Sequence, residues 1–295
     1  MKRRSPSGRR PLLALLCGVC LGAAPLHSRA ADITIGWTAW SDAEFVTKLA
    51  ARLLRDRLHE HVKLTLVSIA LQYQGVARGD IDAMLMAWLP DTHADYYKRY
   101  GNQLVDLGPL YTGARLGWVV PSYVPKTAID SIPDLKKPSV ANHLRRQIYG
   151  IDAGAGETRL SEQAIKDYGL ENYDLILSSG AAMTAMVKRA YARNHWIVAT
   201  AWRPHWMFQQ WHLRFLRDPK GALGGPQHID ALVRKGLADD APEVVAFLRR
   251  MHLPLNDLES AMKVAADSSY EQAVDQYIAE HPKRIQYWVT GKHED

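Results

Sequence analysis

The hydrophobic positions in the first third of the chain switch repeatedly between the spacing of a strand and the spacing of a helix. Apolar runs predict strands over residues 32–37, 62–69 and 81–87. Helical spacing predicts helices over residues 43–59 and 71–78, which separate these strands. Asp42 precedes the first helix and is expected to be its N-cap. An order of strand, helix, strand, helix, strand predicts a parallel sheet.

A second unit of the same kind follows. Apolar runs predict strands over residues 116–120, 148–152 and 196–201. Helical spacing predicts helices over residues 159–168 and 181–192. From residue 229 to residue 289 the pattern is mostly helical, and three prolines are expected to start or break these helices: Pro242, Pro254 and Pro282.

This order of elements predicts an α/β fold with two lobes. Residues 31–112 are expected to form the first part of lobe I, residues 113–208 to form lobe II, and residues 209–295 to return to lobe I as a mostly helical segment. Each lobe is expected to hold a mixed, mainly parallel sheet flanked by helices. Two crossover segments, near residues 111–117 and 207–215, are expected to join the lobes.

Residues 1–30 have the composition of a secretory signal peptide. A basic region precedes the apolar run of residues 12–21, which is too short to span a bilayer. Both cysteines of the chain lie in this segment, so the mature protein is expected to have no disulfide and no thiol site. We therefore expect a soluble protein of the bacterial periplasm.

Removal of the signal peptide would change the charge of the protein. The segment carries six of the 37 Lys and Arg residues and none of the 31 Asp and Glu residues, so the remainder is balanced. The sequence pI of about 9.2 therefore reflects targeting rather than a surface for nucleic acid, and no nucleic-acid partner is expected.

The motifs of common enzymes are missing from the sequence. There is no nucleophile elbow, no P-loop and no zinc-protease motif. The twelve histidines do not have metal-ligand spacing, so neither a metal nor a cofactor is expected. The glycine-rich stretch of residues 150–156 lies between a predicted strand and a predicted helix. It could bind an anion through free N–H groups at the start of that helix, or it could form a tight turn that needs small residues.

Tryptophan is unusually frequent, with nine Trp against four Phe. Trp40, Trp88 and Trp202 each stand at the C-terminal end of a predicted strand, where ligands bind in open α/β sheets. One such residue would be interpreted as a packing residue, but three at equivalent positions favour a shared cleft. Trp faces attract cations, and a well-placed desolvated contact contributes ~2 kcal/mol.

Several segments resemble one protein family in the same order along nearly all of the mature chain. They are Trp40-Ser41-Asp42, Gly79-Asp80-Ile81-Asp82, Trp88-Leu89-Pro90, Gly113-Ala114-Arg115, residues 150–156 and Trp202-Arg203-Pro204-His205-Trp206. Together they resemble the substrate-binding proteins of glycine betaine, choline and proline betaine ABC importers, the OpuAC-like periplasmic binding proteins. The resemblance implies a two-lobed fold of type II, in which both lobes close on the ligand.

The resemblance also implies a tryptophan cage around a trimethylammonium group. Trp40 and Trp88 would come from lobe I, Trp202 would come from lobe II, and Asp42 would lie near the polar end of the ligand. The fourth aromatic wall of some members should follow residues 113–115, where this chain has Leu116 and Trp118; Tyr111 is another candidate. For a ligand carboxylate the candidates are His205 and the backbone of Gly154 to Gly156, although His205 could instead only brace its loop.

We therefore expect a monomeric periplasmic protein that captures a quaternary ammonium solute and delivers it to an ABC permease. An enzyme that acts on choline or methylamines is one alternative, but it would need a general base or a redox cofactor site beside the cage. A ligand-binding sensor without transport is another, and a neighbouring permease and ATPase would favour transport. The residues leave open which solute is preferred.

Overall fold

The computed structural model describes residue 1 and residues 32–293 of the chain. Apart from residue 1, the predicted signal peptide lies outside the described residues. The fold described here belongs to the compact unit that begins at Ala31. Within this part of the chain every helix is too short or too polar to cross a bilayer.

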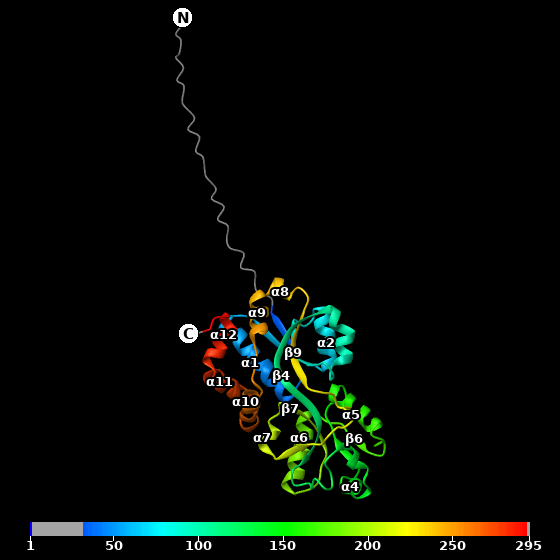
Figure 1. The fold of residues 1–295 in the computed structure, drawn as a ribbon. Helices are drawn as coiled ribbons and strands as arrows, with labels where there is room; N and C mark the ends of the chain where they lie inside the picture. The colour runs from blue at the N-terminus through cyan, green and yellow to red at the C-terminus, as the bar shows by residue number, and fades with distance from the viewer. Residues whose placement is uncertain (2–31, 294–295) are drawn as a thin grey trace. The chain divides into compact units, whose positions relative to one another are not determined.

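Nine strands of the described residues form one mixed sheet (Figure 1). The strands follow the order β2-β1-β3-β9-β4-β7-β5-β6, and β8 pairs with β4 beside this path. Their bounds are β1 Ile33–Trp37, β2 Val62–Leu66, β3 Ala83–Leu89, β4 Leu104–Pro121, β5 Gln147–Tyr149, β6 Asp174–Ile176, β7 Ala199–Arg203, β8 Leu213–Phe215 and β9 Gln227–Arg234. The predicted α/β class is therefore confirmed.

The first half of the sheet contains the predicted parallel strands. β1 lies between β2 and β3 and runs parallel to both. Helices α1 (Ser41–Arg57) and α2 (Ile69–Arg78) connect these strands. α1 turns one apolar face to the core, because Phe45, Leu49 and Leu53 recur at helical spacing and are buried.

Two details of this half differ from the sequence prediction. Asp42 is not the N-cap of α1: the helix begins at Ser41, and Trp40, with an extended backbone, is the N-cap. Asp42 is therefore inside the first turn, and its side chain accepts hydrogen bonds from Tyr111 and Trp202 on other strands. The second strand ends at Leu66, and residue 69 already belongs to α2.

Strand β4 is much longer than the predicted strand of residues 116–120, and it belongs to both halves of the sheet. Its first part pairs with β9, and the part from Arg115 to Val119 pairs with β7. The register with β9 shifts between Thr112 and Ala114, and Gly113 between them has φ +77°. Glycine suits this bulge because it has no Cβ to oppose a positive φ.

The second half of the sheet has β5 parallel to both β6 and β7, while β4 runs antiparallel to β7 and β8. The predicted strands are shifted or shortened here, to Gln147–Tyr149 and Ala199–Arg203. The helices between β3 and β8 are α3 Ala94–Tyr100, α4 Pro138–His143, α5 Gly156–Asp167, α6 Gly180–Ala192 and α7 Met207–Gln210, with short 3-10 helices at Gly101–Gln103 and Ile132–Lys136. Helix α5 begins three residues earlier than predicted, at the last glycine of the glycine-rich stretch.

The C-terminal region is not helical from its start. β9 occupies Gln227–Arg234 between β3 and β4, because its apolar run is buried on both faces like that of a central strand. The helices that follow are α8 Leu237–Asp240, α9 Pro242–Arg250, α10 Leu255–Asp267, α11 Tyr270–Glu280 and α12 Pro282–Thr290. The three prolines stand at helix starts as predicted. Figure 1 shows α10 to α12, in orange and red, beside α1.

The buried apolar residues form two clusters. The larger one covers the first half of the sheet and the C-terminal helices, where Phe45 packs edge-on against Tyr277 with ring centroids 5.6 Å apart. The smaller one lies in the second half and includes Trp118. The indole N–H of Trp118 donates to the Ser161 hydroxyl (2.9 Å). Trp118 is therefore a core residue rather than a cavity wall.

Trp118→Ala is expected to lower the free energy of unfolding by about 3–5 kcal/mol, because it removes a large buried side chain and leaves a cavity. Ser161→Ala removes only the hydrogen-bond acceptor and is expected to cost about 1–2 kcal/mol. Urea denaturation followed by circular dichroism measures both values. Small and equal effects of the two changes would contradict the placement of Trp118.

Candidate functional site

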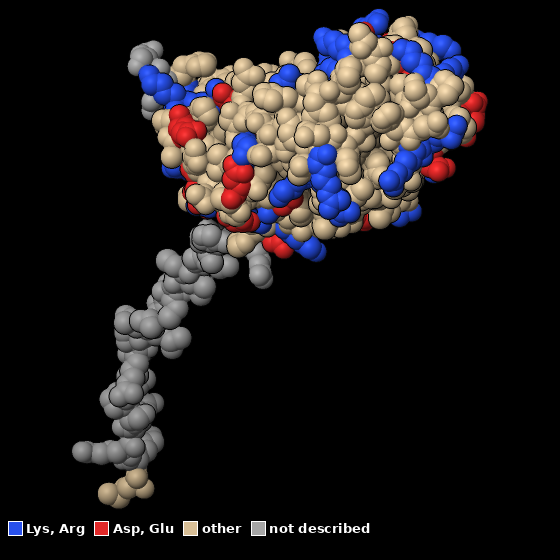
Figure 2. All heavy atoms as spheres, turned by 90° about the horizontal axis from the view of Figure 1, so that it is seen from below, with Lys and Arg blue, Asp and Glu red and all other residues tan. Residues whose placement is uncertain are grey.

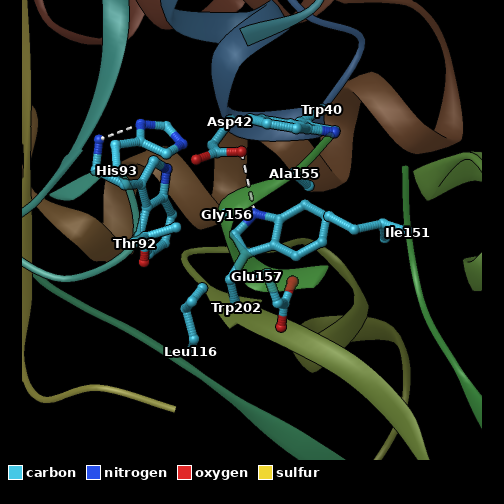
Figure 3. Close-up of a pocket in the computed structure, with 11 residues that line it drawn as sticks. Trp40, Asp42, Thr92, His93, Leu116, Ile151, Ala155, Gly156, Glu157 and Trp202 are labelled. Atoms are coloured by element: carbon cyan, nitrogen blue, oxygen red, sulfur yellow. Dashed lines mark hydrogen bonds between the residues drawn. The ribbon is translucent and has the colours of Figure 1, made fainter. Parts of the chain in front are cut away.

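One small cavity lies where both halves of the sheet meet (Figure 3). Its volume is about 20 Å³, which is enough for about one water molecule. The lining residues come from α1 and its N-cap, from β3 and the segment after it, from β4, from the segment between β5 and α5, from the start of α5 and from β7. They are Trp40, Asp42, Trp88, Thr92, His93, Leu116, Ile151, Ala155, Gly156, Glu157 and Trp202.

The indole N–H group of each of the three tryptophans has a partner within the protein. Trp40 donates its indole N–H to Asp152 (2.9 Å), and Trp202 donates to Asp42 (3.0 Å). The indole N–H of Trp88 contacts the sulfur of Met86 at 3.0 Å. Each N–H is therefore satisfied by the protein, which leaves the apolar ring faces as the surfaces offered to a ligand.

Asp42 connects three elements behind these rings. Its side chain is fully buried, and its two oxygens accept from different donors: Oδ1 from the indole of Trp202 and Oδ2 from the hydroxyl of Tyr111 (2.8 Å). Burial raises the pKa of the Asp42 carboxyl to about 6, and the hydrogen bonds from Tyr111 and Trp202 oppose this rise. At neutral pH this carboxyl is mostly ionised, so it places a negative charge beside the aromatic faces.

Two further polar side chains line the cavity. Glu157 is 3% exposed, and neither of its carboxyl oxygens has a hydrogen-bond partner within residues 32–293. Burial raises its pKa to about 8, the nearby backbone amide of Ala201 opposes this rise, and the charge of Asp42 adds to it. His93 accepts the Trp88 backbone N–H on Nδ1 (3.1 Å), so Nε2 carries the hydrogen, and this nitrogen has no partner in the described structure. Burial lowers the pKa of His93 to about 3, so the ring is neutral.

Gly156 allows the start of α5 to approach the segment after β3. A Cβ at this position would lie 2.2 Å from the carbonyl oxygen of Thr92. The same contact region holds Arg159, whose guanidinium donates to the carbonyls of Asp91 and Thr92, and Tyr96, whose hydroxyl donates to the carbonyl of Gly154. A side chain at position 156 would force these two surfaces apart.

The structure brings five of the eight predicted site residues to the cavity: Trp40, Trp88, Trp202, Asp42 and Gly156. The other three are close neighbours that do not line it. Tyr111 stands behind Asp42. His205 is buried, accepts the Met207 backbone N–H on Nδ1 (3.1 Å) and packs edge-on against Trp202. Gly154 lies outside, and its only role in the described contacts is to accept from Tyr96.

Sequence reasoning did not select three polar lining residues: Thr92, His93 and Glu157. Thr92 and His93 follow Trp88 by a few residues, so the loop after that strand was the available signal. Glu157 stands in the first turn of a helix, where an acidic residue is ordinary because it complements the helix dipole. Leu116 occupies the place expected for a fourth wall, and that wall is not aromatic.

No group of three or more His, Cys, Asp or Glu residues in the described ranges is arranged to hold a metal ion. The cavity therefore offers ring faces, two carboxyl groups and a neutral imidazole. An apolar cavity with a few convergent polar groups is typical of a site that binds a small molecule.

The chain belongs to the OpuAC family, the substrate-binding domain of ABC-type glycine betaine transport systems, whose family model matches residues 31–280. This is a family of binding proteins rather than enzymes. The chain is 37% identical over 158 residues to the glycine betaine/carnitine transport binding protein GbuC of Listeria monocytogenes. That match covers 52% of this chain and 53% of GbuC, so the chain spans about half the length of this curated relative.

Solved structures show the same fold. Lactococcal OpuAC in its closed-liganded conformation with glycine betaine is 32% identical, with a TM-score of 0.82 over 88% of this chain and 99% of that one. ProX of Borrelia burgdorferi is 29% identical, with a TM-score of 0.82 over 88% of this chain and 97% of that one. A choline binding protein in complex with choline, at 22% identity, has a TM-score of 0.80 over 90% of this chain and 93% of that one, which shows a shared fold alone.

The buried hydrogen bond between Trp202 and Asp42 predicts a titration. A neutral carboxyl is a weaker acceptor than a carboxylate, so the indole N–H resonance of Trp202 should shift with a midpoint near pH 6. NMR spectra across this range measure the shift. Asp42→Asn should abolish it, and the indole N–H of Trp118, which is bonded to Ser161, is the internal control. A Trp202 resonance that does not move would contradict the raised pKa.

Proposed function

We propose that the protein binds a quaternary ammonium compatible solute, such as glycine betaine, choline or a related betaine, and delivers it to an ABC permease. The observation that carries this proposal is the set of three Trp rings on one cavity, each fixed through its N–H, with the carboxylate of Asp42 behind them. Ring faces attract a methylated ammonium through their quadrupoles. The fixed Asp42 charge adds attraction in a site that excludes water. We therefore propose that Asp42 lies at the ammonium end of the ligand, whereas the resemblance implied its polar end.

Closure of two lobes is part of this proposal. The half of the sheet around β1 would form lobe I, and the half around β5 would form lobe II, with β4 as one crossover. β8 pairs with β4 in the second half and β9 lies in the first, so the second crossover would be the segment of residues 216–226 between them. In this proposal lobe II would end later than residue 208, and the second crossover would follow residues 207–215 instead of occupying them as the sequence pattern suggested.

The contacts between the two halves support a closed arrangement. Trp40 donates to Asp152, Gly156 packs on Thr92, and Arg203 of β7 forms two hydrogen bonds with the buried carboxylate of Glu259 in α10 (2.7 and 2.8 Å). A cavity of about 20 Å³ cannot admit a trimethylammonium group unless its walls separate. Ligand entry would therefore open these contacts, and ligand binding would stabilise the state in which they form again.

Three residues around the cavity would support the binding site. Tyr111 orients Asp42, and His205 braces the loop that carries Trp202. Leu116 forms the fourth, non-aromatic wall.

The protein would act as a periplasmic monomer after removal of the signal peptide. Basic and acidic side chains are interspersed on the face shown in Figure 2, and most of that face is formed by other residues, which fits a solute carrier better than a nucleic-acid binder.

Isothermal titration with glycine betaine, choline, proline betaine and carnitine tests the proposed function. We expect saturable binding of at least one of these solutes. Trp88→Ala and Trp202→Ala should each weaken it by about 30-fold, because each removes a cation contact of ~2 kcal/mol. Trp196→Ala is the matched control, since Trp196 stacks on His143 outside the cavity. No binding of any of the four solutes would contradict the function, and unchanged binding in both cavity variants would contradict the site.

Gly156→Ala tests closure. The added methyl group would meet the carbonyl of Thr92, and overpacking of this kind typically costs about 1–3 kcal/mol. We expect at least about a fivefold loss of solute affinity, measured by the same titration. Gly154→Ala is the control, because a Cβ there meets nothing within 4 Å. Equal affinities of the two variants would show that the two surfaces need not approach each other for binding.

A further inference from the structure

The cavity contains hydrogen-bonding groups that the protein leaves unused. Both oxygens of Asp42 already accept hydrogen bonds, from Trp202 and Tyr111. Both oxygens of Glu157 and the Nε2 nitrogen of His93 are buried without a partner among residues 32–293. Unpaired buried polar atoms are costly, so groups of this kind in a cavity indicate contacts completed by a ligand.

The start of α5 adds further donors at the same place. Its N-cap residue, Ala155, has no side-chain oxygen, so no side chain caps the first amides of the helix. Ala155, Gly156 and Glu157 all line the cavity. The N-terminus of α5, a helix of twelve residues, favours negative charge. The buried side chain of Glu157, which has no partner among the described residues, stands in the first turn of this helix.

The unused groups are mainly donors. The ring N–H of His93 can only donate while the imidazole is neutral, and the amides of α5 can only donate. A protonated Glu157 adds an O–H. The ammonium end of a ligand is already served by the ring faces and by Asp42, and in the view of Figure 3 Asp42 and Glu157 lie on opposite sides of the Trp202 ring. His93 lies beside Asp42 in that view, so we assign the acceptor group of the ligand to the side of the cavity with Glu157 and the start of α5.

Building on the proposed function, we propose that Glu157 acts as a neutral carboxylic acid that donates a hydrogen bond to the carboxylate of the ligand. The site then prefers a zwitterionic betaine to a quaternary ammonium alcohol such as choline. Glu157 is a specificity-determining residue in this proposal. An ionised Glu157 would instead repel the ligand carboxylate across a dry cavity.

The surroundings of Glu157 support its neutral form. Burial raises its pKa to about 8, although the nearby backbone amide of Ala201 and the N-terminus of α5 favour the ionised form. Asp42 of α1 is the acidic group that faces it, and His93 is neutral. Leu116 of β4 and Trp202 of β7 add no charge. On its own helix, the guanidinium of Arg159 is 3.2 Å from the carboxylate of Asp95. A ligand carboxylate would raise the pKa of Glu157 further, so binding above pH 8 would take up one proton.

Titrations of glycine betaine and choline between about pH 6 and pH 9.5 test this inference. At pH 7 we expect glycine betaine to bind at least about tenfold more tightly than choline. Its affinity should then fall by about tenfold per pH unit above pH 8, since one proton must accompany it. Choline affinity should not fall in this range. Glu157→Gln keeps a donor, so it should bind glycine betaine without the loss at high pH.

Two more variants complete the experiment. Glu157→Leu lacks the donor and should lose about 10–100-fold in affinity for glycine betaine while it keeps its affinity for choline, which also shows that it is folded. Glu162→Gln, at an exposed position of the same helix, should behave like the unchanged protein. A preference for choline, or glycine betaine binding that is independent of pH and of position 157, overturns this inference alone. Absence of binding for both ligands in the unchanged protein overturns the proposed function as well.

Discussion

The buried carboxylate of Asp42 determines how the rest of the cavity is arranged. It accepts hydrogen bonds from Tyr111 on β4 and from Trp202 on β7, and it comes from the first turn of α1. One charged group therefore fixes the position of an aromatic ring from the other half of the sheet. A charge removed from water is tolerated only when hydrogen bonds or an opposite charge compensate it. Two hydrogen bonds do so in part, and a bound ammonium group would complete the compensation.

In this arrangement the indole N–H groups have a structural role, and the ring faces are the surfaces offered to a ligand. The three indole N–H groups are bound to Asp152, Met86 and Asp42, so the rings keep their orientation without a ligand. Preorganised walls reduce the entropy cost of binding. Glu157 and the Nε2 nitrogen of His93 are left without partners among the described residues, and in the inference above Glu157 would pair with the carboxylate of the ligand. The ring faces and Glu157 would thus recognise the ammonium group and the carboxylate of the same small molecule.

The sequence allowed the class of fold and the three cavity tryptophans to be predicted, because strand and helix periods are local and because Trp40, Trp88 and Trp202 all follow strand patterns. It did not allow β9 to be predicted, since a strand buried on both faces lacks alternation and its apolar run resembles a helix segment. Glu157 was missed for a related reason. Its helical position is ordinary, and only the packing of α5 against the segment around Thr92 makes it a buried residue without partners.

A crystal structure of the protein with glycine betaine would show both ends of the ligand in the cavity. We expect the trimethylammonium group against the faces of Trp40, Trp88 and Trp202, within about 6 Å of the ring centroids. We also expect the ligand carboxylate within hydrogen-bonding distance of Glu157, about 2.5–2.7 Å for an O–H donor to a carboxylate. A ligand bound away from these rings, or one that approaches them with its carboxylate, would contradict the account.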